Sequence, residues 1–213
     1  MSIQAIPGVQ FIPQTHRCYE YVLDFVIASA ALGSYMNAYH NQVVTSFAPH
    51  SSGGVPQYPT CAFAGNASGK TVEFIPHDLF VNIFCNDTRK GSIPYLSKSV
   101  FQSATGNSTG AMAETLEGFA QAMFTRYYEN NLAAIEATCG QRRQNKWPPV
   151  LQFAAVVRDA MSHGGVIHMF PSVPPVTHFQ LNYSQANNGR KILHNDMTCA
   201  DMFFLMLDMD AVF

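Results

Sequence analysis

The chain has 213 residues, of which 47% are hydrophobic and 12% charged, about half the charged share of an average soluble protein. This composition excludes a disordered chain and is sufficient for one well-buried domain, which we expect to span residues 1–213. The net charge of −2 provides no overall basic field, so any affinity for nucleic acid has to come from a local patch.

The N-terminal part of the sequence predicts an extended arm followed by one long helix. Residues 1–14 carry two prolines and lack the basic and apolar regions of a signal peptide. Residues 15–44 are apolar on almost every side, which is typical of a helix buried in a core or spanning a membrane. Asp24 interrupts this run and no basic flank anchors it, so we expect a core helix and no membrane span.

The middle of the chain carries weaker patterns. Residues 48–69 are rich in Gly, Pro, Ser and Asn and predict a long loop. We expect a short strand over 70–75, one or two helical turns over 76–84 and a short helix over 94–103. Residues 104–110 predict another loop.

Two helices with clear amphipathic spacing follow. Apolar residues recur every three or four positions over 112–127, which predicts a long helix over about 109–139 that Gly140 ends. Pro148 and Pro149 suit the first turn of a second helix. Its predicted buried face consists of Val150, Phe153, Ala154, Val157 and Met161.

A small β-structure is predicted after this second helix. We expect a short strand over 166–170. Residues 176–183 alternate between apolar and polar side chains, which indicates a further strand. Asn188-Gly189 is a strong turn signal, so this strand should pair antiparallel with residues 190–194.

The chain closes with an apolar segment over 202–213, which predicts a final helix. Thr198 and Asp201, just before it, have the spacing of a capping box. The expected fold class is therefore mainly α, with a small antiparallel β-hairpin near the C-terminus.

Three residues with chemical potential gather at the end of the second amphipathic helix. Two adjacent glycines, Gly164 and Gly165, predict that this helix stops there, so Arg158, Asp159 and His163 should lie on its last two turns. Asp159 and His163 are four residues apart and should be neighbours. The cluster also has an ordinary structural interpretation, because cations near a helix C-terminus are favourable by roughly 0.3–1 kcal/mol.

The segment Arg158-Asp159-Ala160-Met161-Ser162-His163 resembles the signature of the HEPN superfamily, which is an Arg, a following polar residue and a His four to six residues after the Arg. The predicted hairpin and final helix are similar to those of a bacterial, plasmid-encoded branch of that superfamily. The resemblance implies a single HEPN-like helical bundle that acts as a metal-independent endoribonuclease in the cytoplasm. It also implies a homodimer and an antitoxin-like protein partner.

Under this resemblance, each of the three residues has a catalytic role. His163 would transfer a proton, since the imidazole pKa lies near neutrality. Arg158 would bind phosphate through its forked guanidinium, and Asp159 would orient or polarise His163. Each chain offers one such motif, so the two proton-transfer groups of the reaction would come from two motifs facing each other across a homodimer.

The candidate RNA-binding patch precedes the motif helix. Arg142, Arg143 and Lys146 lie within a short polar segment, 141–146. A cluster of this kind is either a contact for RNA phosphates or a solvated loop between helices, and the sequence leaves both interpretations open.

Metal and cofactor sites are not expected. Five scattered cysteines without a paired spacing indicate buried thiols in a reducing compartment rather than a zinc site. His163 and His168 are separated by the helix stop, and no third ligand has a fixed spacing to them. The sequence also lacks a P-loop and a dinucleotide-binding fingerprint.

Three functional hypotheses remain open from the sequence. The first is the ribonuclease just described. The second is a non-catalytic HEPN-like module that binds RNA, a nucleotide or a protein partner with the same residues. The third is an assembly protein in which the motif is only a helix end.

Overall fold

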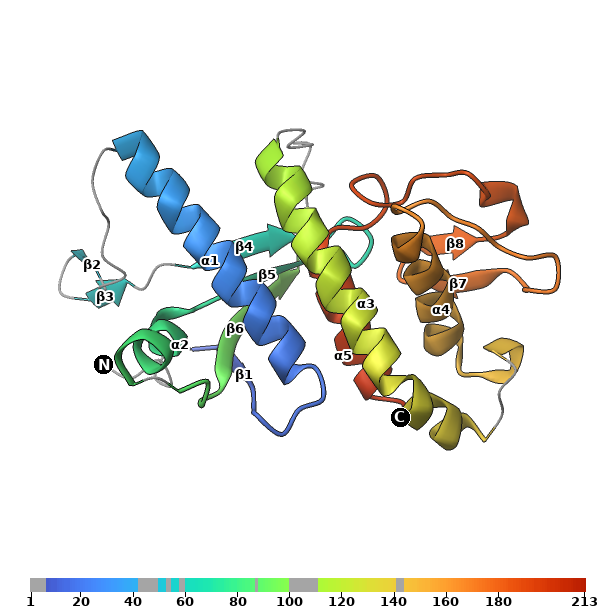
Figure 1. Cartoon of the computed structure of the whole chain (residues 1–213), viewed down its shortest axis with the longest axis horizontal. Helices are drawn as coiled ribbons and strands as arrows, with labels where there is room; N and C mark the ends of the chain where they lie inside the picture. The colour runs from blue at the N-terminus through green and yellow to red at the C-terminus, as the bar shows by residue number, and fades with distance from the viewer. Residues whose placement is uncertain are drawn as a thin grey trace. The chain divides into compact units, whose positions relative to one another are not determined.

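The computed structural model describes residues 7–41, 50–52, 55–57, 60–86, 88–99, 111–140 and 144–213. The chain divides into two compact units, and Figure 1 colours the chain by residue number. Unit 1 consists of Met1–Phe63 and Thr71–Ser99, and unit 2 of Ala64–Lys70 and Val100–Phe213. The single domain over residues 1–213 stays a prediction.

Unit 1 is built on a four-stranded antiparallel sheet in the order β1-β6-β5-β4. Its strands are only three to seven residues long, as expected where Gly, Pro and polar turn residues interrupt the chain. The strands are β1 (Gln10–Ile12), β4 (Cys61–Ala64), β5 (Lys70–Phe74) and β6 (Ile93–Ser99). A separate pair of strands, β2 (His50–Ser52) and β3 (Val55–Gln57), is antiparallel.

The long N-terminal helix α1 (Tyr19–Asn41) packs on this sheet. The Phe25 ring of α1 lies 5.2 Å from the Phe63 ring of β4, and Phe63 lies 6.3 Å from Phe74 of β5. The apolar run thus forms a core helix, as predicted. Among the described residues, no helix is both long enough and apolar enough to cross a membrane.

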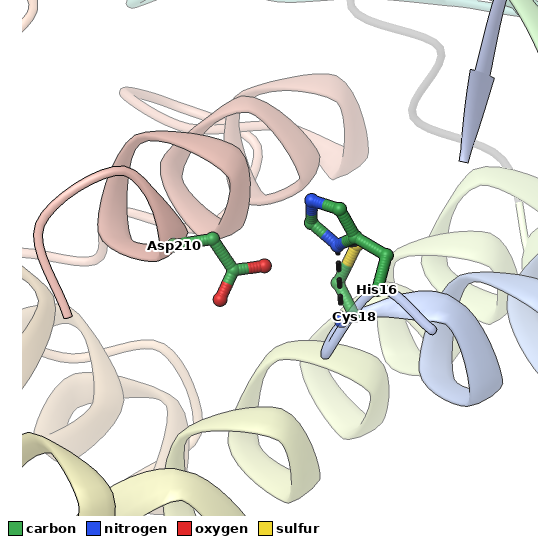
Figure 2. A group of neighbouring side chains, drawn as sticks. All are labelled: His16, Cys18 and Asp210. Atoms are coloured by element: carbon green, nitrogen blue, oxygen red, sulfur yellow. Dashed lines mark hydrogen bonds between the residues drawn. The ribbon is translucent and has the colours of Figure 1, made fainter. Parts of the chain in front are cut away.

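Two polar contacts anchor the start of α1. Asp24, which interrupts the apolar run of this helix, lies 2.5 Å from Nη2 of Arg89. The His16 ring precedes the helix, with Nδ1 3.0 Å from the Cys18 sulfur; Figure 2 draws this pair. Asp210, drawn in the same view, belongs to unit 2.

The mainly α prediction is wrong, because unit 1 contains strands where the sequence predicted a loop and a helix. The expected loop 48–69 holds β2, β3 and β4, and the expected helix 94–103 is strand β6, which continues to Ser99. β6 lies between β1 and β5, so its conformation depends on partners distant in sequence, which local patterns do not reveal. The protein is a mixed α/β structure. The predicted loop 104–110 lies outside the described residues.

Unit 1 is completed by a short helical segment between β5 and β6. It consists of α2 (His77–Phe80) and a π-helical turn at Val81–Cys85. The one or two helical turns predicted over 76–84 are confirmed.

Three α-helices pack together in the described part of unit 2. They are α3 (Ala111–Cys139), α4 (Pro149–Ser162) and α5 (Cys199–Asp210), with α5 in contact with both others. Figure 1 shows the long α3 beside α5, and α4 beside strand β7. The fully buried aromatic rings of Phe124, Phe153 and Phe203 come from the three helices in turn, so the predicted apolar faces do form the core.

The C-terminal hairpin exists but uses a different pairing from the predicted one. β7 (Val176–His178) pairs antiparallel with β8 (Leu181–Tyr183), so the predicted strand 176–183 folds back on itself. Phe179 in the turn has a φ of 52°, which lies in the left-handed region that bulky side chains rarely adopt. Gly189 has a positive φ, as turn glycines often do, but the predicted strand 190–194 that follows it forms only an isolated bridge between Lys191 and Val166.

Helix α5 begins at a fully buried carboxylate. Asp201 closes the predicted capping box, since its Oδ2 accepts the N–H of Thr198 at 3.0 Å. The same carboxylate accepts the backbone N–H groups of Asn66, at 2.9 Å, and Ser68, at 2.7 Å. Three backbone N–H groups that donate to this one carboxylate explain how its charge can be buried.

Candidate functional site

The end of α4 is fixed by two glycines in the left-handed conformation. Gly164 has a φ of 69° and Gly165 a φ of 80°, and the N–H of Gly165 donates to the carbonyl of Ala160 at 2.8 Å. A Cβ added at Gly165 would lie 2.7 Å from Cβ of Leu193, so only glycine fits there. The reversal directs the following residues back along α4.

His163 stands at the C-cap of α4, one residue after the last helical residue. Its Nδ1 lies 2.8 Å from the backbone carbonyl of Asp159 but 3.8 Å from the Asp159 carboxylate. Because a carbonyl only accepts hydrogen bonds, Nδ1 carries the hydrogen, and Nε2 of the neutral ring is left as the proton acceptor. The backbone of Asp159, rather than its carboxylate, orients the imidazole.

Arg158 is already engaged by a carboxylate of α3. Its Nε and Nη2 both contact Oε1 of Glu129, and its guanidinium carbon lies 5.9 Å from the centre of the Tyr128 ring. A guanidinium has five N–H donors, so this ion pair leaves others for a further partner. The pair holds the arginine in place and partly neutralises its charge.

A second histidine lies next to His163. The His168 ring is stacked on the His163 ring, with centroids 5.9 Å apart and an interplanar angle of 28°. On its other side His168 meets the edge of Phe170, whose side chain is 62% exposed. From its sequence position, His168 is considered above only as a candidate metal ligand. The double glycine was the signal in the sequence that could have located His168, because the chain reversal at these glycines returns the next residues to the end of α4.

A pocket of about 570 Å³ opens beside these residues. One wall is a face of α4, with Gln152, Ala155, Val156 and Asp159 at helical spacings of three and four, joined by Arg158. The opposite wall is the returning segment 168–176, to which His168 and Phe170 belong, and Asn145 contributes from the segment before α4. Apolar, polar and charged side chains together line the pocket, and this mixture is typical of a small-molecule site.

The predicted residues are brought together only in part. Arg158 and Asp159 line the pocket, and His163 adjoins it through His168. The predicted RNA-binding residues Arg142 and Arg143 lie outside the described residues. Lys146 is exposed at the end of a 3-10 turn, Gln144–Lys146, next to Asn145 of the pocket.

Comparisons with protein-family models, with curated proteins and with solved structures find no match to this chain.

Proposed function

We propose that this protein binds single-stranded RNA at the unit 2 pocket and cleaves it without a metal ion. The observation that carries the proposal is the pair of stacked imidazoles, His163 and His168, at a pocket lined by Arg158. Metal-independent RNA cleavage needs a base, an acid and a cation near one phosphodiester, and these residue types supply them. The likeness of the α4 end to the HEPN signature supports the same proposal.

Each group has a definite task in the proposed reaction. Nε2 of His163 takes the proton of the ribose 2′-hydroxyl, and the 2′-oxygen then attacks phosphorus. The bond from phosphorus to the 5′-oxygen breaks, and protonated His168 donates its proton to that oxygen. The products are a 2′,3′-cyclic phosphate and a 5′-hydroxyl, while the donors of Arg158 that Glu129 leaves available stabilise the phosphorane charge.

The exposed Phe170 ring supports a single-stranded substrate. Aromatic platforms bind unstacked bases, and one such contact contributes about 1–3 kcal/mol. In the free protein this phenylalanine is 62% exposed, and contact between its apolar surface and water is unfavourable. A ligand that covers the ring removes this contact, and its binding is therefore favoured.

The proposal needs one chain only. The homodimer implied by the resemblance would supply a second imidazole, and in this proposal His168 of the same chain supplies it. We propose that the protein acts in a reducing, cytoplasmic setting, which its five thiols support. An antitoxin-like partner is not needed for the chemistry.

The test is cleavage of a fluorescent single-stranded RNA in the presence of EDTA. We expect His163→Ala and His168→Ala each to reduce the rate by about 10²–10⁴, the usual contribution of a general acid or base. His77→Ala, in unit 1, is the control and should cleave at the wild-type rate. Cleavage by either site variant at the wild-type rate would overturn the proposal.

A second candidate is binding without turnover. It is favoured by the ion pair of Arg158 with Glu129, which lowers the charge available to stabilise a transition state. Wild-type protein that binds the same RNA in EDTA but releases no product would select this candidate.

A further inference from the structure

The face of α4 that lines the pocket carries hydrogen-bonding groups at its two ends. Gln152 and Asp159 are seven residues apart and so share one face, about 10 Å apart along the helix axis. Ala155 and Val156 lie between them as a small apolar floor. A flat ligand lying on that floor would meet an amide at one end and a carboxylate at the other.

The carboxylate of Asp159 is available to a ligand. His163 uses the backbone carbonyl of Asp159, and its Nδ1 is 3.8 Å from the carboxylate, beyond hydrogen-bond distance. The Asp159 side chain is 29% exposed, so a ligand in the pocket can reach it. An ionised carboxylate only accepts hydrogen bonds, so it attracts N–H donors and repels carbonyl oxygens.

Gln152 is oriented by the protein itself. Its Nε2 donates to the backbone carbonyl of Trp147 at 2.7 Å, and that carbonyl fixes which end of the amide is nitrogen. Gln152 therefore presents Oε1 and its remaining N–H in a defined orientation. A matching ligand edge has a donor and an acceptor side by side.

These groups discriminate among the four RNA bases. Guanine has two adjacent donors, N1–H and the 2-amino group, which match the two oxygens of a carboxylate. Adenine and cytosine have one amino group next to a ring acceptor, and uracil has one N–H between two carbonyls. A charge-assisted pair of parallel hydrogen bonds is the strongest of these arrangements.

We propose that the pocket is a guanine-binding subsite, in which Asp159 accepts hydrogen bonds from N1–H and the 2-amino group. Phe170 stacks at the rim of the pocket and Gln152 contacts another edge of the base. The inference rests on the proposed function in taking RNA as the ligand, and it makes Asp159 a specificity-determining residue rather than the partner that orients His163.

The first experiment measures binding of the four nucleoside 3′-monophosphates to the full chain by titration calorimetry in EDTA. We expect the guanosine nucleotide to bind at least about tenfold more tightly than the others, as one charge-assisted pair predicts. Asp159→Asn should remove this preference, since an amide offers one acceptor and places a donor against the base. Asp78→Asn, an exposed carboxylate of unit 1, is the matched control and should leave the preference intact.

Equal affinities for the four nucleotides, or a preference for another base, would overturn the guanine subsite. So would a folded Asp159→Asn variant that still prefers guanosine. Cleavage of RNA with and without guanine separates this inference from the proposed function. Guanosine preference without cleavage refutes only the nuclease, whereas cleavage without base preference refutes only the guanine subsite.

Discussion

At the scale of single residues, the ion pair between Arg158 and Glu129 decides how much positive charge the pocket offers. Both groups are partly exposed, with 34% and 39% of their side-chain surfaces accessible. An exposed pair of this kind contributes on the order of 1 kcal/mol or less. An incoming phosphate can therefore compete with Glu129 for the guanidinium.

Replacing Glu129 tests this competition. Glu129→Gln should tighten RNA binding severalfold, because Arg158 would no longer share its charge with a neighbouring carboxylate. The measurement is fluorescence anisotropy in a His163→Ala background, in which the proposed cleavage is blocked. Glu114→Gln, an exposed residue at the other end of α3, serves as the control. Weaker binding in the Glu129 variant would show that the pair holds Arg158 in its binding position.

At the scale of elements, the two glycines that end α4 should differ in their sensitivity to substitution. Both have positive φ, which costs a side-chain-bearing residue roughly 1–2 kcal/mol. At Gly164 no described atom lies within 4 Å of an added Cβ, whereas at Gly165 Leu193 lies 2.7 Å away.

Gly164→Ala should therefore lower the free energy of unfolding by about 1 kcal/mol, and Gly165→Ala by at least about twice as much. Urea denaturation of the two variants measures the difference. Equal losses would mean that the contact with Leu193 relaxes without cost. Because the reversal positions His168, Gly165→Ala should also slow RNA cleavage more than Gly164→Ala does.

The same elements show which features the sequence could predict. Helices α3, α4 and α5 were predicted because their signals are local, consisting of apolar spacing, Pro148 before α4 and the cap at Thr198. The hairpin was predicted with the wrong pairing, since Asn188-Gly189 is a stronger turn signal than the Phe179-Gln180 turn that the chain uses.

Part of the candidate site was predictable for the same reason. Arg158, Asp159 and His163 share one helix end, and helical spacing makes Asp159 and His163 neighbours. His168 was not found, because its position beside His163 depends on the chain reversal at Gly165. The His163 ring bonds the backbone carbonyl of Asp159 in place of its carboxylate, and this choice depends on a side-chain torsion that a sequence does not show.

At the scale of the whole molecule, the sheet of unit 1 separates the observed fold from the predicted helical bundle. Its strands come from residues 10–12, 61–64, 70–74 and 93–99, and they are stabilised by pairing across these gaps in sequence. Unit 2 holds all the described residues of the candidate site, so the functional proposal depends on α3, α4, α5 and the segments around them.

The stability of the chain should depend on pH through one buried carboxyl group. Glu117 of α3 is 7% exposed, and its Oε1 accepts a hydrogen bond from the Cys199 thiol at 3.4 Å, while Oε2 has no hydrogen-bond partner among the described residues. Burial raises the pKa of Glu117 from its ordinary value of 4.5 to about 7, and the charge of Asp201 adds to the rise. Between pH 4.5 and about 7, the folded protein therefore holds a proton on Glu117 that the unfolded chain has lost.

Because the folded-state pKa is raised, stability contributed by protonated Glu117 is lost as pH increases. Below pH 4.5 the Glu117 carboxyl is neutral in both states and does not lower the stability. Between pH 4.5 and about 7, the unfolded chain ionises while the folded protein stays protonated. Above about 7, the folded state carries the full free-energy cost of a buried carboxylate. That cost is on the order of 3 kcal/mol.

Glu117→Gln keeps the shape and the acceptor for Cys199 but cannot ionise, so the variant should be more stable than the wild type at pH 8 by up to this amount. At pH 4.5 the two proteins should be nearly equal. Urea denaturation of both proteins at the two pH values measures the difference, and Glu114→Gln, exposed on the same helix, should show no such pH-dependent gain. If the difference in stability between the wild type and the Glu117→Gln variant is the same at both pH values, the pKa of Glu117 is not raised in the folded protein.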